Sequence, residues 1–195
     1  MSETLKNLGK AFIGESQARN RYLFYAKVAG KENYPQLAEI FTQTADQEKE
    51  HAKQLLLMIN DLRVKEGLSP MDSIMVDAKV ETNFGDTKAN LESAIMGEHH
   101  ETTEMYPEFA KVALEEGLVE IAGRLKAIAL AEKHHEERYQ KFLDGMTNGT
   151  LWKKAEPVKW VCRECGYEHT GTEPPKVCPA CKHDYWYYQV KCEEY

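Results

Sequence analysis

Four segments of this 195-residue chain share one pattern, with apolar residues at helical spacing near both ends and ionisable residues in the middle. In the last segment the apolar positions recur at steps of three and four up to Ile128, and the next steps fall on Glu132 and His135. The central carboxylates of the other three segments are Glu15, Glu48 and Glu98. Such a chain is expected to pack four amphipathic helices around a core whose centre is polar.

The connections predict how the helices are arranged. Residues 30–34 and the single Gly117 are short links that suit antiparallel neighbours, whereas the segment 66–85 has about 20 residues and a weak pattern. At about 3.3 Å per residue, that segment can run the length of a long helix. We therefore expect a mainly α fold, a four-helix bundle with one long crossover.

The bundle sequence also repeats itself. AKVA at 26–29 returns at 110–113, and the same offset of 84 relates Tyr22 to Tyr106, Glu48 to Glu132 and His51 to His135. Earlier in each repeat the offset is 83, which pairs Glu15 with Glu98. One extra residue therefore lies between Glu98 and Tyr106, and a single insertion within a helix is typical of a π-bulge. We predict a π-bulge there that turns Glu101 inward.

The two E-x-x-H motifs at the centre of the bundle favour a metal site. A lone motif of this kind would most often lie on a solvated helix face, but these two lie on core seams, where uncompensated carboxylates are very costly. Spacing i, i+3 places each Glu and His on one helix face, and carboxylate with imidazole donors suits iron or manganese. The ligands expected for a dinuclear centre are Glu15, Glu48, His51, Glu98, Glu132 and His135, with Glu101 as an additional ligand.

Two further roles are predicted around this centre. We expect His51 and Glu101 to exchange at one metal ion, with histidine bound in the reduced state and glutamate in the oxidised state, because added positive charge favours an anionic ligand. Tyr22 and Tyr106 either pack as ordinary core aromatics or donate hydrogen bonds that orient the carboxylates. The histidines expected at the surface are His99, His100 and His134.

The five cysteines all fall after residue 161. Two C-x-x-C motifs separated by 12 residues predict a tetrathiolate site for zinc or iron, with disulfides as the less favoured alternative. The expected ligands are Cys162, Cys165, Cys178 and Cys181, and Cys192 is a spare thiol. Gly145, Asn148 and Gly149 end the helical pattern, so we divide the chain into a bundle at 1–148 and a cysteine domain at 149–195.

Charge and hydropathy exclude other classes of function. A net charge of -7 and a pI near 5.6 argue against nucleic-acid binding. The polar N-terminal segment and the lack of a long apolar run argue against membrane targeting, so we expect a cytoplasmic protein.

Over nearly its whole length the chain resembles rubrerythrin, a ferritin-like di-iron bundle followed by a rubredoxin-like iron domain. The resemblance lies in GESQARNRY, EKEH, GEHHETTEMYPEFA, AEKHH, VCRECGY and CPACKHDYWY. Lys182 departs from it, because rubredoxin-like knuckles usually carry glycine there; the residue is expected to need an unusual φ and to shift the potential of the iron.

The resemblance implies a function. Rubrerythrins reduce hydrogen peroxide to water at a di-iron centre, which a mononuclear Fe(Cys)4 centre re-reduces with electrons that come from NAD(P)H through a separate reductase or rubredoxin. The resemblance also implies a homodimer in which the rubredoxin-like domain of one chain lies near the di-iron site of the other. The alternatives are a ferroxidase or iron-handling protein with a structural zinc or iron knuckle, and an electron carrier or redox sensor.

Overall fold

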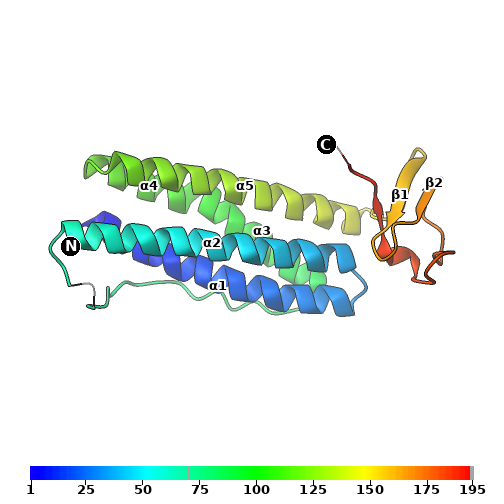
Figure 1. The fold of residues 1–195 in the computed structure, drawn as a ribbon, viewed down its shortest axis with the longest axis horizontal. Coiled ribbons are helices and arrows are strands. Elements are labelled where there is room, and N and C mark those ends of the chain that lie inside the picture. Colours follow the sequence, from blue (N-terminus) through cyan, green and yellow to red (C-terminus); the bar gives the residue numbers. More distant parts are fainter. Residues whose placement is uncertain (70, 194–195) are drawn as a thin grey trace.

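The computed structural model describes residues 1–69 and 71–193, and it shows a long helical bundle with a small β unit at one end (Figure 1). The bundle consists of α1 (Glu3–Lys31), α2 (Pro35–Lys65), α3 (Thr87–His100), α4 (Tyr106–Glu115) and α5 (Val119–Thr147). A five-residue π-helix, η1 (Glu101–Met105), joins α3 to α4, so that these three elements form one long rod of the bundle. The predicted mainly α, ferritin-like architecture is confirmed, and so is the π-bulge.

Local chemistry sets where the helices begin. The side chain of Ser2 accepts a hydrogen bond from the amide of Leu5 at 3.1 Å, and Asp86 accepts one from Ala89 at 2.8 Å, so both residues are N-caps. Pro35 occupies the first turn of α2, where its missing N–H costs nothing. Gly117, with φ +77°, allows the tight turn between α4 and α5.

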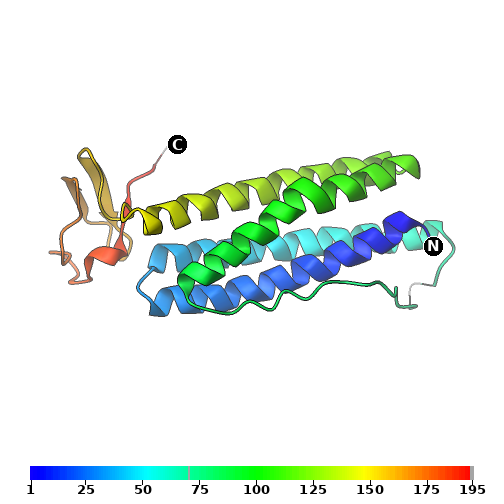
Figure 2. The same ribbon diagram turned by 180° about the vertical axis from the view of Figure 1, so that it is seen from behind.

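The crossover between α2 and α3 is extended and runs along α1 (Figure 2). The side-chain amide of Gln17 donates to the backbone carbonyl of Lys79 at 3.0 Å, and the Tyr25 hydroxyl donates to the backbone carbonyl of Asn83 at 2.8 Å. These two bonds fix the crossover against one side of the bundle.

Two apolar clusters pack the bundle on either side of its centre. The first, at the end that carries the N-terminus, contains Leu5, Leu8, Leu55, Leu62 and Leu125 among others. The second, at the opposite end, is aromatic and contains Tyr22, Tyr25, Phe41 and Tyr139. The ionisable residues lie between the clusters, as the interrupted seams predict.

The β unit is a three-stranded antiparallel sheet in the order β2-β1-β3, formed by β1 (Val158–Cys162), β2 (Glu168–Gly171) and β3 (Tyr188–Val190), with a 3-10 turn, η2 (Tyr185–Tyr187), before β3. Trp160, Cys162, Cys178 and Tyr188 form its small core. The unit lies against the bundle through Trp152, which stacks on Tyr34 with ring centroids 5.7 Å apart, and through an ion pair between Arg163 and Glu39. Its separation from the bundle at residues 148 and 149 stays a prediction. Within the described chain, no helix has a stretch both long and apolar enough to cross a membrane.

Candidate metal centres

Two groups of four side chains converge at the centre of the bundle. Each group offers donor atoms that lie within 4.8 Å of one another. The first group is Glu15, Glu48, His51 and Glu132; the second is Glu48, Glu98, Glu132 and His135. Because Glu48 and Glu132 belong to both groups, they stand where two neighbouring metal ions would share ligands.

The internal repeat explains why the groups come as a pair. Exchanging Glu15 with Glu98, Glu48 with Glu132 and His51 with His135 converts the first group into the second. The tyrosines follow the same exchange. The Tyr22 hydroxyl donates to Glu98 Oε1 at 2.5 Å, and the Tyr106 hydroxyl donates to Glu15 Oε1. Each repeat therefore supplies the tyrosine that holds the first glutamate of the other repeat.

The carboxylates are fully buried and incompletely paired, which is the test of whether they fit a metal ion. The carboxylates of Glu15, Glu98 and Glu132 are 0% exposed. In the described bundle, only two imidazoles face these three carboxylates and that of Glu48: His135 Nδ1 lies 3.0 Å from Glu48 Oε1 and 2.9 Å from Glu132 Oε2, and His51 Nδ1 lies 2.9 Å from Glu132 Oε1. Glu15 Oε2 and Glu98 Oε2 have no hydrogen-bond partner among the described residues. Buried anions in such a state require compensating positive charge. The donor set fits two divalent ions.

The pKa values of the central glutamates and histidines also indicate that positive charge stabilises this site. Burial raises the pKa of Glu98 to about 8 and that of Glu15 well above its usual range, with Glu132 adding to the rise at Glu15. Burial opposes ionisation of Glu48 too, but hydrogen bonds from His135 and His51 outweigh it and lower its pKa to about 2. Burial alone would lower the pKa of His135, yet the carboxylates of Glu132 and Glu48 raise it to about 11. The carboxylates and the histidines thus stabilise each other's charged forms, and the same oxygen and nitrogen atoms are the donors of the two groups.

Within the described bundle, the π-helix η1 interrupts the second repeat and has no counterpart in the first. Glu101 is its first residue and is half-buried, and burial together with Glu15 and Glu98 raises its pKa well above the usual range. Its carboxylate nevertheless belongs to neither four-residue group, whereas His51 belongs to the first. The structure therefore places Glu101 beside the centre and His51 in it.

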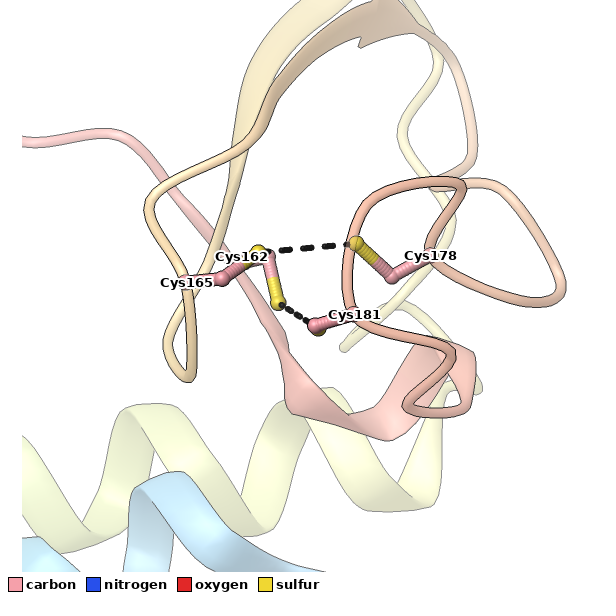
Figure 3. A group of neighbouring side chains, drawn as sticks. All are labelled: Cys162, Cys165, Cys178 and Cys181. Carbon is pink, nitrogen blue, oxygen red and sulfur yellow. Dashed lines mark hydrogen bonds between the residues drawn. The ribbon is translucent and has the colours of Figure 1, made fainter.

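The four predicted cysteines form a third group. Their sulfurs lie within 4.8 Å of one another, with Cys162 to Cys181 and Cys165 to Cys178 each at 3.7 Å (Figure 3). Burial opposes ionisation of Cys178, but the neighbouring Tyr188 hydroxyl and backbone amides outweigh it and lower its pKa to about 6. Thiolates are the form that binds zinc or iron.

Two features complete this description of the cysteine group. Cys192 is exposed and outside it. Lys182 has φ +67°, in the left-handed region that favours glycine, as its departure from the family pattern predicts.

Sequence reasoning missed two residues near these groups. His183 approaches Cys181, with Nδ1 3.3 Å from the sulfur, and nothing in the sequence pattern marks it. Tyr139 packs on Tyr22 with ring centroids 5.6 Å apart, and burial and Glu98 raise its pKa. Tyr139 lies at an apolar position of the helical pattern, so the sequence alone indicates an ordinary core residue. The three histidines predicted at the surface, His99, His100 and His134, are exposed.

A four-helix bundle with one long crossover and paired carboxylate–histidine groups at its centre defines a ferritin-like di-metal carboxylate protein. Residues 6–143 match the family model described as Rubrerythrin, and residues 160–189 match the model described as Rubrerythrin, rubredoxin-like domain. The chain belongs to the rubrerythrin family. The three groups match the cofactors of that family, a non-haem di-iron centre and a mononuclear Fe(Cys)4 centre.

Similar proteins agree with this assignment. The chain is 55% identical over 196 residues to a putative rubrerythrin of Methanocaldococcus jannaschii, an alignment that covers 100% of this chain and 96% of that protein. A mixed-valence structure of nigerythrin has a TM-score of 0.64 at 28% identity and covers 98% of this chain and 88% of that chain. The bacterioferritin of Desulfovibrio desulfuricans, described with a di-iron site, has a TM-score of 0.64 at 25% identity and covers 75% of this chain and 81% of that chain.

Proposed function

We propose that this protein reduces hydrogen peroxide to water at the di-iron centre, as the terminal component of an NAD(P)H peroxidase chain in the cytoplasm. The observation that carries the proposal is the presence, in one chain, of a paired carboxylate–histidine site and a four-cysteine site. A reaction that takes up two electrons needs a donor that restores them one at a time, and a tetrathiolate iron supplies single electrons. A reductase or rubredoxin would in turn reduce the four-cysteine site.

Each group of residues has a role in this reaction. Iron ions bound by the two groups would hold the peroxide and provide the two electrons that break its O–O bond. Glu48 and Glu132 would hold the ions as a pair, because each belongs to both groups. Tyr22 and Tyr106 orient Glu98 and Glu15 through their hydroxyl groups, which also hold protons next to the centre. The absence of cysteine from residues 1–161 also keeps oxidisable thiols out of the bundle.

We also propose a homodimer in which electrons pass between chains. Arg163, next to Cys162, contacts Glu39 on α2. Glu39 lies nine residues from Glu48, about 14 Å along the helix, and the four cysteines lie beyond Glu39 by the length of an arginine side chain. The cysteine group is thus remote from the metal centre of its own bundle, which favours transfer to the centre of a partner.

We further propose that Glu101 replaces His51 as a ligand when the centre is oxidised. The position of Glu101 just outside the first group supports this exchange. Crystals of the iron-loaded protein in its reduced and oxidised states test it, and identical coordination in the two states would refute it.

The first experiment on the function is anaerobic. Metals are counted per chain, the protein is fully reduced, and stoichiometric hydrogen peroxide or oxygen is added while the visible spectrum is followed. We expect about three irons per chain, from the donor groups present, and faster oxidation of both centres by peroxide than by oxygen. The likeness to bacterioferritin supports a second candidate, a ferroxidase or iron-handling protein with a structural knuckle. Zinc on the cysteines, or faster oxidation by oxygen, would favour that candidate.

A further inference from the structure

A pocket of about 460 Å³ lies between α1, the crossover and the rod formed by α3, η1 and α4. The crossover that covers this side of the bundle is visible in Figure 2. One wall is apolar and is formed by Met96, Met105 and Phe109. The polar and charged residues of the lining are Lys10, Gln17, Arg21, Asp77, Lys79, Glu81, His100 and Glu101. Small-molecule sites combine apolar surface with polar groups that orient the ligand.

The pocket reaches the metal centre through Glu101, which forms part of its lining. Gly14 and Gly97 also line it and keep this part open, because neither has a side chain. A Cβ atom on Gly14 would lie 3.9 Å from Glu101 Oε1, and one on Gly97 would lie 3.8 Å from Arg21 Nη2. The guanidinium group of Arg21 and the carboxylate of Glu101 therefore border the same space.

Arg21 has unused hydrogen-bonding capacity. Its side chain is only 13% exposed, and its Nε and Nη1 atoms lack a hydrogen-bond partner in the described parts of the chain. Its ion pair with Glu81 of the crossover is long, at 3.7 Å. A buried donor without an acceptor is costly, so an oxygen-bearing ligand in the pocket would be stabilised.

Hydrogen peroxide alone does not account for this pocket. A water molecule occupies about 30 Å³ of liquid, and hydrogen peroxide has two such oxygens, so the space is several times larger than the substrate needs. Hydrogen peroxide also has no hydrocarbon group that could pack against the apolar wall. A ligand that fits has a hydrocarbon group at one end and oxygen at the other.

We propose that the pocket admits small organic hydroperoxides, ROOH, as additional substrates. The R group packs on Met96, Met105 and Phe109, and the peroxide end passes Arg21 and Glu101 toward the metal centre. The O–O bond breaks, one oxygen stays on R as the alcohol, and the other leaves as water; two electrons and two protons are consumed. This inference rests on the proposed function, because the electrons come from the same donor chain.

Binding is tested without turnover. The full chain, loaded with diamagnetic zinc and labelled at the methionine methyl carbons, is titrated with 2-phenyl-2-propanol, the alcohol formed from cumene hydroperoxide. We expect the NMR signals of Met96 and Met105 to shift and those of Met58 and Met146, which lie outside the pocket lining, to stay in place. Shifts spread over all four methionines, or none, would overturn the inference.

Turnover is tested with a matched pair of variants of the iron-loaded protein. Met96 and Leu130 are helical residues of nearly equal exposure, 69% and 70%, and only Met96 lines the pocket. For Met96→Trp we expect kcat/KM for cumene hydroperoxide, relative to that for hydrogen peroxide, to fall about tenfold, whereas Leu130→Trp leaves the ratio unchanged. An equal ratio in both variants would overturn the inference.

The wild-type protein separates the two proposals. Reduction of hydrogen peroxide without reduction of cumene hydroperoxide overturns the organic substrate and leaves the peroxidase function standing. Reduction of neither overturns both.

Discussion

The two cysteine knuckles contain a natural comparison of glycine and lysine in the same backbone conformation. The amide of Gly166 donates to the carbonyl of Cys162 at 2.8 Å, and the amide of Lys182 donates to the carbonyl of Cys178 at 3.0 Å. Their φ angles are +75° and +67°. The left-handed conformation costs a residue with a Cβ atom about 1–2 kcal/mol relative to glycine. We therefore predict that Lys182→Gly stabilises the folded cysteine domain.

The expected magnitude follows from two opposing terms. Relief of the backbone strain at Lys182 raises the free energy of unfolding by about 1–2 kcal/mol. The greater conformational freedom of glycine in the unfolded chain lowers it by about 0.4–1 kcal/mol. The net gain of about 0.8 kcal/mol corresponds to about a fourfold change in an equilibrium constant. Gly166→Ala should reverse the sign with a similar magnitude, because no atom of the described residues lies within 4 Å of the added Cβ and only the backbone conformation matters.

Metal affinity is the measurement, because metal binding and folding are coupled in small tetrathiolate domains. In competition with a chelator, the zinc dissociation constant of the cysteine site should fall about fourfold for Lys182→Gly and rise about fourfold for Gly166→Ala. Lys182→Ala removes the charge and keeps the backbone strain, so the zinc affinity of this variant should rise little. Lys176 is exposed and has no positive φ, so Lys176→Gly should weaken binding. Equal effects of Lys182→Gly and Lys176→Gly would refute the reasoning.

Three further predictions concern the bundle. Tyr106→Phe removes the donor to Glu15, so the iron content of the bundle after dialysis should fall, while the cysteine site keeps its metal. Removing the bundle metals with a chelator should lower the thermal midpoint of the helices, because the ions bind only the folded centre; calorimetry with and without iron checks this. Burial opposes ionisation of Glu116, but the hydrogen bonds that the amides of Thr4 and Glu3 donate to it together outweigh burial and hold its pKa below the usual value. The stabilisation from ionised Glu116 is therefore fully present above the pKa of this residue in the unfolded chain, and it is lost as pH falls through its pKa in the folded chain. Glu116→Gln should make the free energy of unfolding depend less on pH in the acid range. An unchanged pH dependence would contradict this prediction.

The sequence predicts the bundle well because its signals are local. Proline at the start of α2, Asp86 before α3 and Gly117 before α5 each act within one turn of the helix end they mark. The π-helix was also predictable, because a one-residue change in the repeat offset has few structural explanations. The paired metal groups follow from the same repeat.

Contacts between distant segments were not predictable in this way. The stacking of Trp152 on Tyr34 and the ion pair of Arg163 with Glu39 depend on how the β unit lies against the bundle, which no periodicity encodes. The pocket at Arg21 depends on the path of the crossover, a segment whose pattern is weak because it is extended and packs only a few side chains, such as Leu68 and Ile74, against the core.

The repeat and the π-helix together explain why a nearly symmetric centre is open on one side. Duplicated helix pairs give two equivalent donor groups, and each tyrosine holds the glutamate of the other repeat. The stretch between Glu15 and Tyr22 contains no carboxylate and lies in an uninterrupted α-helix, whereas the matching stretch from Glu98 to Tyr106 contains the inserted residue and Glu101. The π-helix and Glu101 therefore lie on the side of the centre where the pocket lies. The pocket that we propose admits substrate and the ligand that we propose exchanges thus lie on the same face of the centre.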